Sequence, residues 1–233
     1  MGERNGRITT TSSIELIGRR VVVVKRRRAI DEAEPAPNRP SLVSSLTEAE
    51  GRWLVAARHP DVVRVRRVTP AAGVLITDHA GLLTLRTCRL TLRAGAGFLA
   101  AVAVTVADLH RRGLVHGNLR LDHVIVAGAD RLRPVLCSPA PPPRGRSADP
   151  AADVLALADL AVAVADRFPW APRWRAVIDD LRCDGGVIGA TGAARLFTGL
   201  EAWSSGPPVR LLDALAARVP AGAATIRARV GRG

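Results

Sequence analysis

Residues 109–126, LHRRGLVHGNLRLDHVIV, join a long apolar segment to a short one through a polar loop. Residues 93–112 carry Ala, Val and Leu at helical spacing, and Gly113 is a residue type that commonly ends a helix. The loop that follows contains His, Gly and Asn, and two short apolar runs surround the turn sequence GAD. This stretch therefore predicts a buried helix, a polar loop and two short strands.

The residues upstream of this stretch predict a small β-rich unit with one helix. Residues 9–17 alternate well enough for a strand, GRR predicts a turn, and VVVVK predicts the second strand of a hairpin. Residues 44–59 have helical periodicity, with Ser45 or Thr47 as the capping residue. The segments DVVRVRRVTP and GVLITDHA predict two further strands. We therefore place this unit at residues 1–80.

The remainder, residues 81–233, predicts a mainly helical unit. Beyond the Pro-rich connector SPAPPPRGRSADP, residues 151–167 predict a second buried helix. Shorter helices are expected over 171–182, 191–203 and 209–218. The glycine-rich segment GGVIGATG predicts a loop that leads into a helix. Residues 200–233 either complete this unit or form a C-terminal extension.

Composition limits the possible partners. The chain has 233 residues, 48% of them hydrophobic, so it can bury a core and is not a disordered chain. The net charge is +13, but the arginines are spread along the chain and few aromatic side chains lie between them, which argues against nucleic acid as the partner. The simple interpretation is a solvated basic surface. The alternative is an acidic partner protein that meets the arginines at residues 26–28 and 64–67.

Cysteine usage and hydropathy give an expected compartment. Cys88, Cys137 and Cys183 are far apart in the sequence, so they predict neither a zinc site nor a disulfide framework. The N-terminal residues MGERNGRITTTSS contain no apolar signal region, and the two apolar segments are too short or too interrupted to span a membrane. We expect a cytoplasmic protein with no membrane span.

The order of these elements and their motifs resembles the protein kinase fold. VHGNLRLDH resembles the catalytic loop H-R-D-L-x-x-x-N, and VVVVK resembles the V-A-I-K strand. EAEGRWLVAARHPDVVRV resembles the αC helix with its His-Pro turn, VLITDHAG the strand into the hinge, and ADVLALADLAVAV the αF helix with Asp153 as its buried anchor. The resemblance covers residues 10–200. It implies an α+β bilobal fold with a small antiparallel β N-lobe, truncated at its start, one N-lobe helix and a mainly α C-lobe.

Two groups within this fold are candidates. HPDVVRV resembles the corresponding segment of bacterial Ser/Thr protein kinases, whereas VHGN and the short connector to DPAADV are closer to aminoglycoside-type phosphotransferases.

The resemblance also implies a nucleotide site. Lys25, the only lysine among 34 Lys and Arg residues, stands at the phosphate-pairing position, and Glu50 stands at the position of its partner. Thr77 would be the gatekeeper, and Asp78 to Ala80 would line the adenine. A compact ammonium is not interchangeable with an arginine in a packed cleft, which favours a retained Lys25–Glu50 pair. This pair either binds a nucleotide, with ATP as the candidate ligand, or only holds the αC helix in place.

Three catalytic positions depart from the family's pattern. Asn118 stands at the base position, and an amide cannot accept the proton of a substrate hydroxyl. His123 and Cys137 stand at the two magnesium-ligand positions, although Mg²⁺ prefers oxygen ligands. These two residues should lie near each other, so a soft-metal site with His116 or Asp122 is the alternative to simple packing. His116 itself is expected to pack the loop through hydrogen bonds, and no Mg²⁺ site is expected.

The nucleotide lid departs from the pattern as well. Only about eleven residues precede the strand near Ser12, and a strand takes about five of them. The segment MGERNGR lacks the spacing G-x-G-x-x-G, so the first strand is expected to be absent or vestigial. Val23 replaces the small alanine of V-A-I-K and would crowd an adenine ring.

These departures together predict a pseudokinase that acts as a regulatory or scaffolding module for a partner protein, with weak nucleotide binding that does not need Mg²⁺. The alternative is an atypical ATP-dependent phosphotransferase, acting on a protein or a small molecule, that has repurposed the site. Binding of nucleic acid or another anionic surface through the basic charge is a third, weaker hypothesis.

Overall fold

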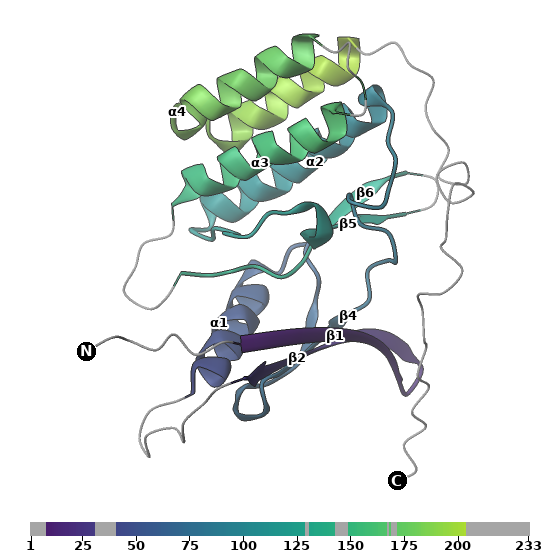
Figure 1. Ribbon diagram of the computed structural model, residues 1–233, viewed down its shortest axis with the longest axis vertical. Helices are drawn as coiled ribbons and strands as arrows, with labels where there is room; N and C mark the ends of the chain where they lie inside the picture. The colour runs from purple at the N-terminus through teal and green to yellow at the C-terminus, as the bar shows by residue number, and fades with distance from the viewer. Residues whose placement is uncertain are drawn as a thin grey trace. The chain divides into compact units, whose positions relative to one another are not determined.

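The computed structural model describes residues 8–30, 41–128, 131–142, 149–166, 168 and 172–203. The chain forms two compact units, and the polypeptide passes from the first to the second after His79. Residues 59–62 also belong to the second unit. Figure 1 shows the strands and one helix of the first unit, and the remaining helices with a small two-stranded sheet in the second.

The first unit is an antiparallel sheet in the order β1-β2-β4-β3. Its strands are β1 (Ile8–Ile17), β2 (Arg20–Ala29), β3 (Val65–Thr69) and β4 (Val74–Asp78). β1 and β2 form the predicted hairpin, and Gly18 takes a positive φ of 61° in its turn, a conformation that glycine adopts without steric cost. β2 extends beyond the predicted VVVVK because its arginines continue to pair with β1 as far as Ala29.

Helix α1 (Leu42–Ala57) packs on this sheet and begins earlier than predicted. The predicted caps Ser45 and Thr47 are wrong, because the hydroxyl of Ser41 accepts a hydrogen bond from the backbone N–H of Ser44. Thr47 instead lies inside the helix with its hydroxyl bonded to a backbone carbonyl of the preceding turn. Gly51 allows close approach to β3, since a Cβ at this position would lie 2.7 Å from the Val68 side chain.

The described part of the second unit contains the helices α2 (Leu92–Arg111), α3 (Pro150–Ala165) and α4 (Pro172–Trp203), which pack against one another. Between α2 and α3 the chain forms a short 3₁₀ helix (Leu121–His123) and the hairpin of β5 (Val124–Ala127) and β6 (Arg133–Leu136). The core of this unit is built from Ala, Val and Leu side chains, with Trp174 and Phe197 as its largest fully buried members. The predicted loop between a buried helix and two short strands is confirmed.

The predicted loop at GGVIGATG is confirmed in part, because α4 consists of two helices that meet at a kink in this segment. The backbone is non-helical at Asp184 and Gly189, and the other residues of the segment are helical. The helical stretches on either side correspond to the predictions over 171–182 and 191–203, whereas the one over 209–218 lies outside the described residues.

Within the described part of the chain, α2 alone is long and apolar enough to cross a membrane, with a mean hydropathy of 1.6. Since 61% of its most apolar window is buried inside the unit, the helix equally fits the description of a core helix, and it is weak evidence for a span.

Candidate functional site

A cluster of three charged side chains joins β2 to α1 in the first unit. The Lys25 Nζ atom lies 2.7 Å from Glu50 Oε1, which is the ion pair expected from the sequence. The second oxygen of Glu50 accepts a hydrogen bond from Arg27, which also reaches the hydroxyl of Thr47. The side chains of Lys25, Arg27 and Glu50 are only 14%, 12% and 3% exposed, so the Glu50 carboxylate binds two nearly buried cations at once.

Arg27 is the member of this cluster that the sequence interpretation missed. The strand pattern could have predicted Arg27, because successive side chains of a strand alternate between the two faces of the sheet. Arg27 lies two residues beyond Lys25 on the same strand and therefore points to the same face, toward α1. Two cationic side chains held side by side favour the approach of an anion.

The remaining predicted nucleotide positions of this unit lie on β4. Thr77 is 8% exposed and stands directly opposite Val23 in the β2–β4 ladder. The carboxylate of Asp78 is held by Arg66, with its two oxygens 2.5 and 2.7 Å from Arg66 Nε and Nη2. This hydrogen bond raises the pKa of Arg66 above its usual value. Ala80, the last predicted adenine contact, belongs to the second unit.

In the second unit, Asp153 of α3 holds the loop at residues 116–118. Its two carboxylate oxygens accept the backbone N–H groups of His116 and Gly117, each at 2.8 Å. His110 at the end of α2 lies 3.0 Å from the same carboxylate. Asp153 is 1% exposed, so the carboxylate is a buried anchor, as expected for its position.

Loop residues 116–118 are also tied to the segment that follows β6. His116 is fully buried, its Nε2 lies 3.1 Å from the carbonyl oxygen of Cys137, and its own carbonyl accepts the N–H of Ala140. Gly117 takes a φ of 67°, and a Cβ there would lie 2.6 Å from the Ala140 carbonyl oxygen. A larger residue, such as the arginine of H-R-D, would therefore clash with the backbone of this segment.

The three departures from the kinase pattern take part in the same network. The Asn118 side-chain Nδ2 donates to the carbonyl oxygen of Ser138 at 2.9 Å. His123 Nδ1 lies 2.9 Å from the Asn118 carbonyl oxygen, and the backbone N–H of Cys137 donates to the carbonyl of His123. The structure thus places His123 near Cys137, as expected, and Asn118 bonds to both segments.

The residues at the expected magnesium positions do not fit Mg²⁺. Asp122, the nearest carboxylate in sequence, binds Arg86, and this hydrogen bond holds its pKa below the usual value. In the described residues no group of three or more His, Cys, Asp and Glu side chains could hold a metal ion. His123 and Cys137 therefore have no third ligand among the described residues, which leaves the soft-metal alternative without support.

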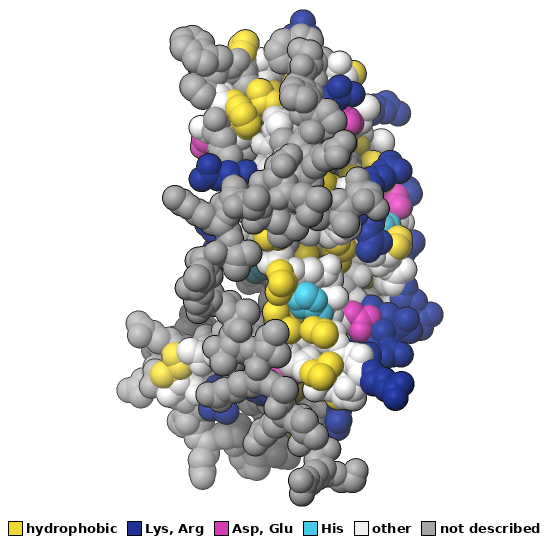
Figure 2. Space-filling model, turned by 90° about the vertical axis from the view of Figure 1, so that its right-hand side faces the viewer, with side chains coloured by type: hydrophobic (Ala, Val, Ile, Leu, Met, Phe, Trp, Pro, Cys, Tyr) yellow, Lys and Arg dark blue, Asp and Glu magenta, His cyan; other side chains and the backbone are white. Residues whose placement is uncertain are grey.

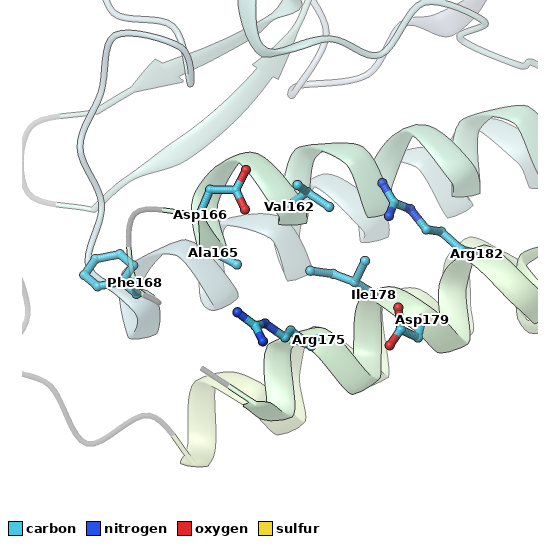
Figure 3. A pocket seen from close by; sticks show the side chains of 8 residues that line it. All are labelled: Val162, Ala165, Asp166, Phe168, Arg175, Ile178, Asp179 and Arg182. Atoms are coloured by element: carbon cyan, nitrogen blue, oxygen red, sulfur yellow. The ribbon is translucent and has the colours of Figure 1, made fainter. Parts of the chain in front are cut away.

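A separate pocket of about 320 Å³ opens between α3 and α4. Figure 3 shows its apolar floor, made by Val162, Ala165 and Ile178, with charged side chains around it. These charges are two arginines and two aspartates, and Arg182 also lies 3.0 Å from Asp159. Because the charges offset one another, the pocket has no excess positive charge for a nucleotide's phosphates.

No family model matches the chain, and no curated protein matches its sequence. Its fold does match a solved one, a crystal structure of the Rad53 kinase domain and SCD2 in complex with AMPPNP. The TM-score is 0.59, and the match covers 89% of this chain and 93% of that one. The fold is protein kinase-like. At 12% identity this likeness establishes the α+β bilobal class and nothing about ligands or activity.

In the kinase-like fold, each predicted site residue now has a place. Lys25, Glu50, Thr77 and Asp78 belong to the sheet-containing unit, and Asn118, His123 and Cys137 to the helical one. Their roles toward a nucleotide or a substrate stay predictions. Besides Arg27, sequence interpretation missed His110 and Arg86, whose partners Asp153 and Asp122 are distant in the sequence.

Changing Asn118 to Asp, which restores the kinase residue, should destabilise the second unit by about 1–3 kcal/mol. The substitution removes the N–H donor and turns a carboxylate oxygen toward the Ser138 carbonyl. Urea denaturation followed by circular dichroism measures the loss. The control is Asp122→Asn, which removes an exposed ion pair and should cost less than about 1 kcal/mol. Equal stability of N118D and the wild type would contradict a structural role for this amide.

Proposed function

We propose that this chain is a kinase-fold protein that has lost ordinary phosphoryl transfer and works as a regulatory or scaffolding module for a partner protein. The observation that carries the proposal is the hydrogen bond from Asn118 to the Ser138 carbonyl. The residue at the base position is an amide whose donor is engaged with the backbone, and it cannot accept a substrate proton. Loss of a general base typically costs about 10²–10⁴ in rate.

The two magnesium positions support the same conclusion. Phosphoryl transfer depends on metal ions that neutralise charge on the transferring phosphate, together with a base and a cation on the phosphates. His123 and Cys137 offer nitrogen and sulfur where Mg²⁺ would need oxygen. A protein that keeps the lysine–glutamate pair while it lacks the base and both metal ligands is better suited to binding than to catalysis.

The charge cluster of Lys25, Arg27 and Glu50 is the part of the chain that would bind the phosphates of a nucleotide. Lys25 and Arg27 place two cations beside each other in a nearly buried environment, and both could interact with a phosphate group without a metal ion. The adenine would lie beneath Val23 and beside Thr77, where valine leaves less room than alanine does. We therefore expect weak binding of ATP that does not require Mg²⁺.

ATP should raise the melting temperature of the wild type equally with and without Mg²⁺. At a concentration tenfold above Kd, the ligand would add about 1.4 kcal/mol of stability, and about 2–4 °C per kcal/mol is expected for a chain of this size. Lys25→Met should abolish the shift while the protein stays folded, because Arg27 still neutralises Glu50. The exposed Arg64→Met is the matched control and should keep the shift.

Two outcomes of this experiment would overturn parts of the proposal. A thermal shift that strictly requires Mg²⁺ would contradict the metal-independent site. Transfer of labelled phosphate to the protein or to a small molecule, abolished by Asn118→Ala, would favour the atypical phosphotransferase instead.

A further inference from the structure

Strand β1 forms one edge of the sheet in the first unit. Within the described residues, no strand pairs with its outer side. A two-residue turn joins Ile17 to Arg20, and in such a hairpin these closing residues form a hydrogen-bonded pair. The backbone groups of alternate residues then point away from β2, and on β1 these residues are Thr10, Ser12, Ile14 and Leu16.

Contacts on the opposite side of β2 agree with this alternation. The Val21 carbonyl accepts the N–H of His79, and the Arg27 N–H donates to the Gly73 carbonyl. The backbone N–H and C=O groups of the odd-numbered residues of β2 therefore point toward β4, and those of its even-numbered residues point toward β1. The even-numbered residues of β2 pair with odd-numbered residues of β1, whose backbone groups form the hydrogen bonds of the hairpin. The backbone groups of the even-numbered β1 residues therefore point to the outer edge of the sheet.

This edge lacks the protection that exposed strands usually carry. Natural edge strands are commonly short, or carry Lys, Pro or several charges that prevent another strand from pairing. β1 is ten residues long, with the sequence ITTTSSIELI, and contains no Lys, Arg or Pro in a chain with 34 Lys and Arg residues. Its one charged residue, Glu15, is bound by Arg26. The edge is therefore competent to accept an added strand.

The arginine side chains beside β1 favour an added strand that carries acidic residues. Arg26 on β2 reaches across β1, where its Nη1 atom lies 3.0 Å from Ser13 Oγ and 2.8 Å from Glu15 Oε1. Arg28 lies two residues further on the same face, opposite Thr9, and is exposed. Within the described ranges Arg28 has no acidic partner. An arginine at this position can reach past β1 to the side chain of a strand paired on its outer side.

We propose that β1 binds an extended, acidic segment of a partner protein as an added strand, with a carboxylate directed toward Arg28. The proposal rests on the proposed function as a binding module and names its class of partner. Lys and Arg side chains predominate over Asp and Glu on the face drawn in Figure 2, in agreement with the net charge of +13. Such a surface attracts an acidic segment, whereas a second copy of this chain would bring two highly basic proteins together.

Two capped ten-residue peptides test the proposal, one alternating valine with aspartate and the other alternating valine with lysine. Fluorescence anisotropy with the full chain should show the aspartate peptide binding at least about tenfold more tightly than the lysine peptide. Ser12→Pro should abolish this binding, because it removes an outward N–H but no hydrogen bond between β1 and β2. Ser12→Ala keeps that N–H and should bind like the wild type. Arg28→Glu should weaken the preference for the aspartate peptide.

Thermal unfolding of each variant without peptide verifies that the fold is retained. Equal binding of the two peptides, or undiminished binding by a folded Ser12→Pro variant, would overturn the proposal. A wild-type dimer in sedimentation that Ser12→Pro dissociates would also overturn it, because a second copy would then occupy the edge. Ser12→Pro should leave the ATP thermal shift unchanged, so failure of the peptide experiment and failure of nucleotide binding are distinguishable.

Discussion

Replacing Asp153 with alanine should lower the free energy of unfolding of the second unit by about 3–5 kcal/mol. The carboxylate is 1% exposed and accepts hydrogen bonds from the backbone N–H groups of His116 and Gly117. Removing it leaves both donors and the His110 ring without this partner inside the protein. Each buried donor that loses its partner costs about 1–3 kcal/mol. Urea denaturation monitored by the helical circular dichroism signal measures the effect.

The same helix provides a matched control for Asp153. Asp159 also pairs with a cationic side chain, Arg182, but it is 72% exposed. Asp159→Asn should therefore change stability by less than about 1 kcal/mol. Asp153→Asn, which keeps one acceptor oxygen, should fall between the two. If Asp153→Ala cost no more than Asp159→Asn, Asp153 would not be the anchor of this loop.

The fold could be predicted to the extent that it follows from local periodicity and residue order. Alternation predicted the β1–β2 hairpin, and helical spacing predicted α1, α2 and α3. The cap of α1 was mispredicted because several hydroxyl residues lie close together, and the choice of Ser41 depends on where the chain turns toward the sheet. The segment GGVIGATG was predicted in part: glycine's low helix propensity agrees with the kink at Asp184 and Gly189, whereas the helix resumes where Ala190 is buried.

The site could be predicted where one motif residue determines the position of another. The kinase resemblance placed Lys25 opposite Glu50, and the structure contains that ion pair. The resemblance could not place Arg27 on Glu50, because the family's pattern has no role for that residue. Nor could it connect Asn118 with Ser138, since the hydrogen bond joins residues on either side of the β5–β6 hairpin. This hydrogen bond depends on the relative positions of two backbone segments, which no local sequence pattern specifies.

The second large effect is expected at Glu50. Glu50→Gln should destabilise the first unit by about 3–5 kcal/mol, because it removes the buried carboxylate that binds the nearly buried Lys25 and Arg27. Hydrogen exchange of the backbone amides in α1 and β2 would report this loss in the first unit separately from the second. Glu48→Gln is the control on the same helix. Its side chain is 43% exposed and pairs at the surface with Arg52, so the loss of its charge should cost less than about 1 kcal/mol.

A double-mutant cycle identifies the origin of the Glu50 effect. If the penalty comes from two uncompensated cations, removing one of them should recover part of the lost stability. Adding Arg27→Met to Glu50→Gln should then cost clearly less than the sum of the two single substitutions, with a coupling of about 0.5–3 kcal/mol. Strict additivity would show that Arg27 and Glu50 act independently. In that case the cluster would lack the shared charge balance on which metal-independent binding of a phosphate depends.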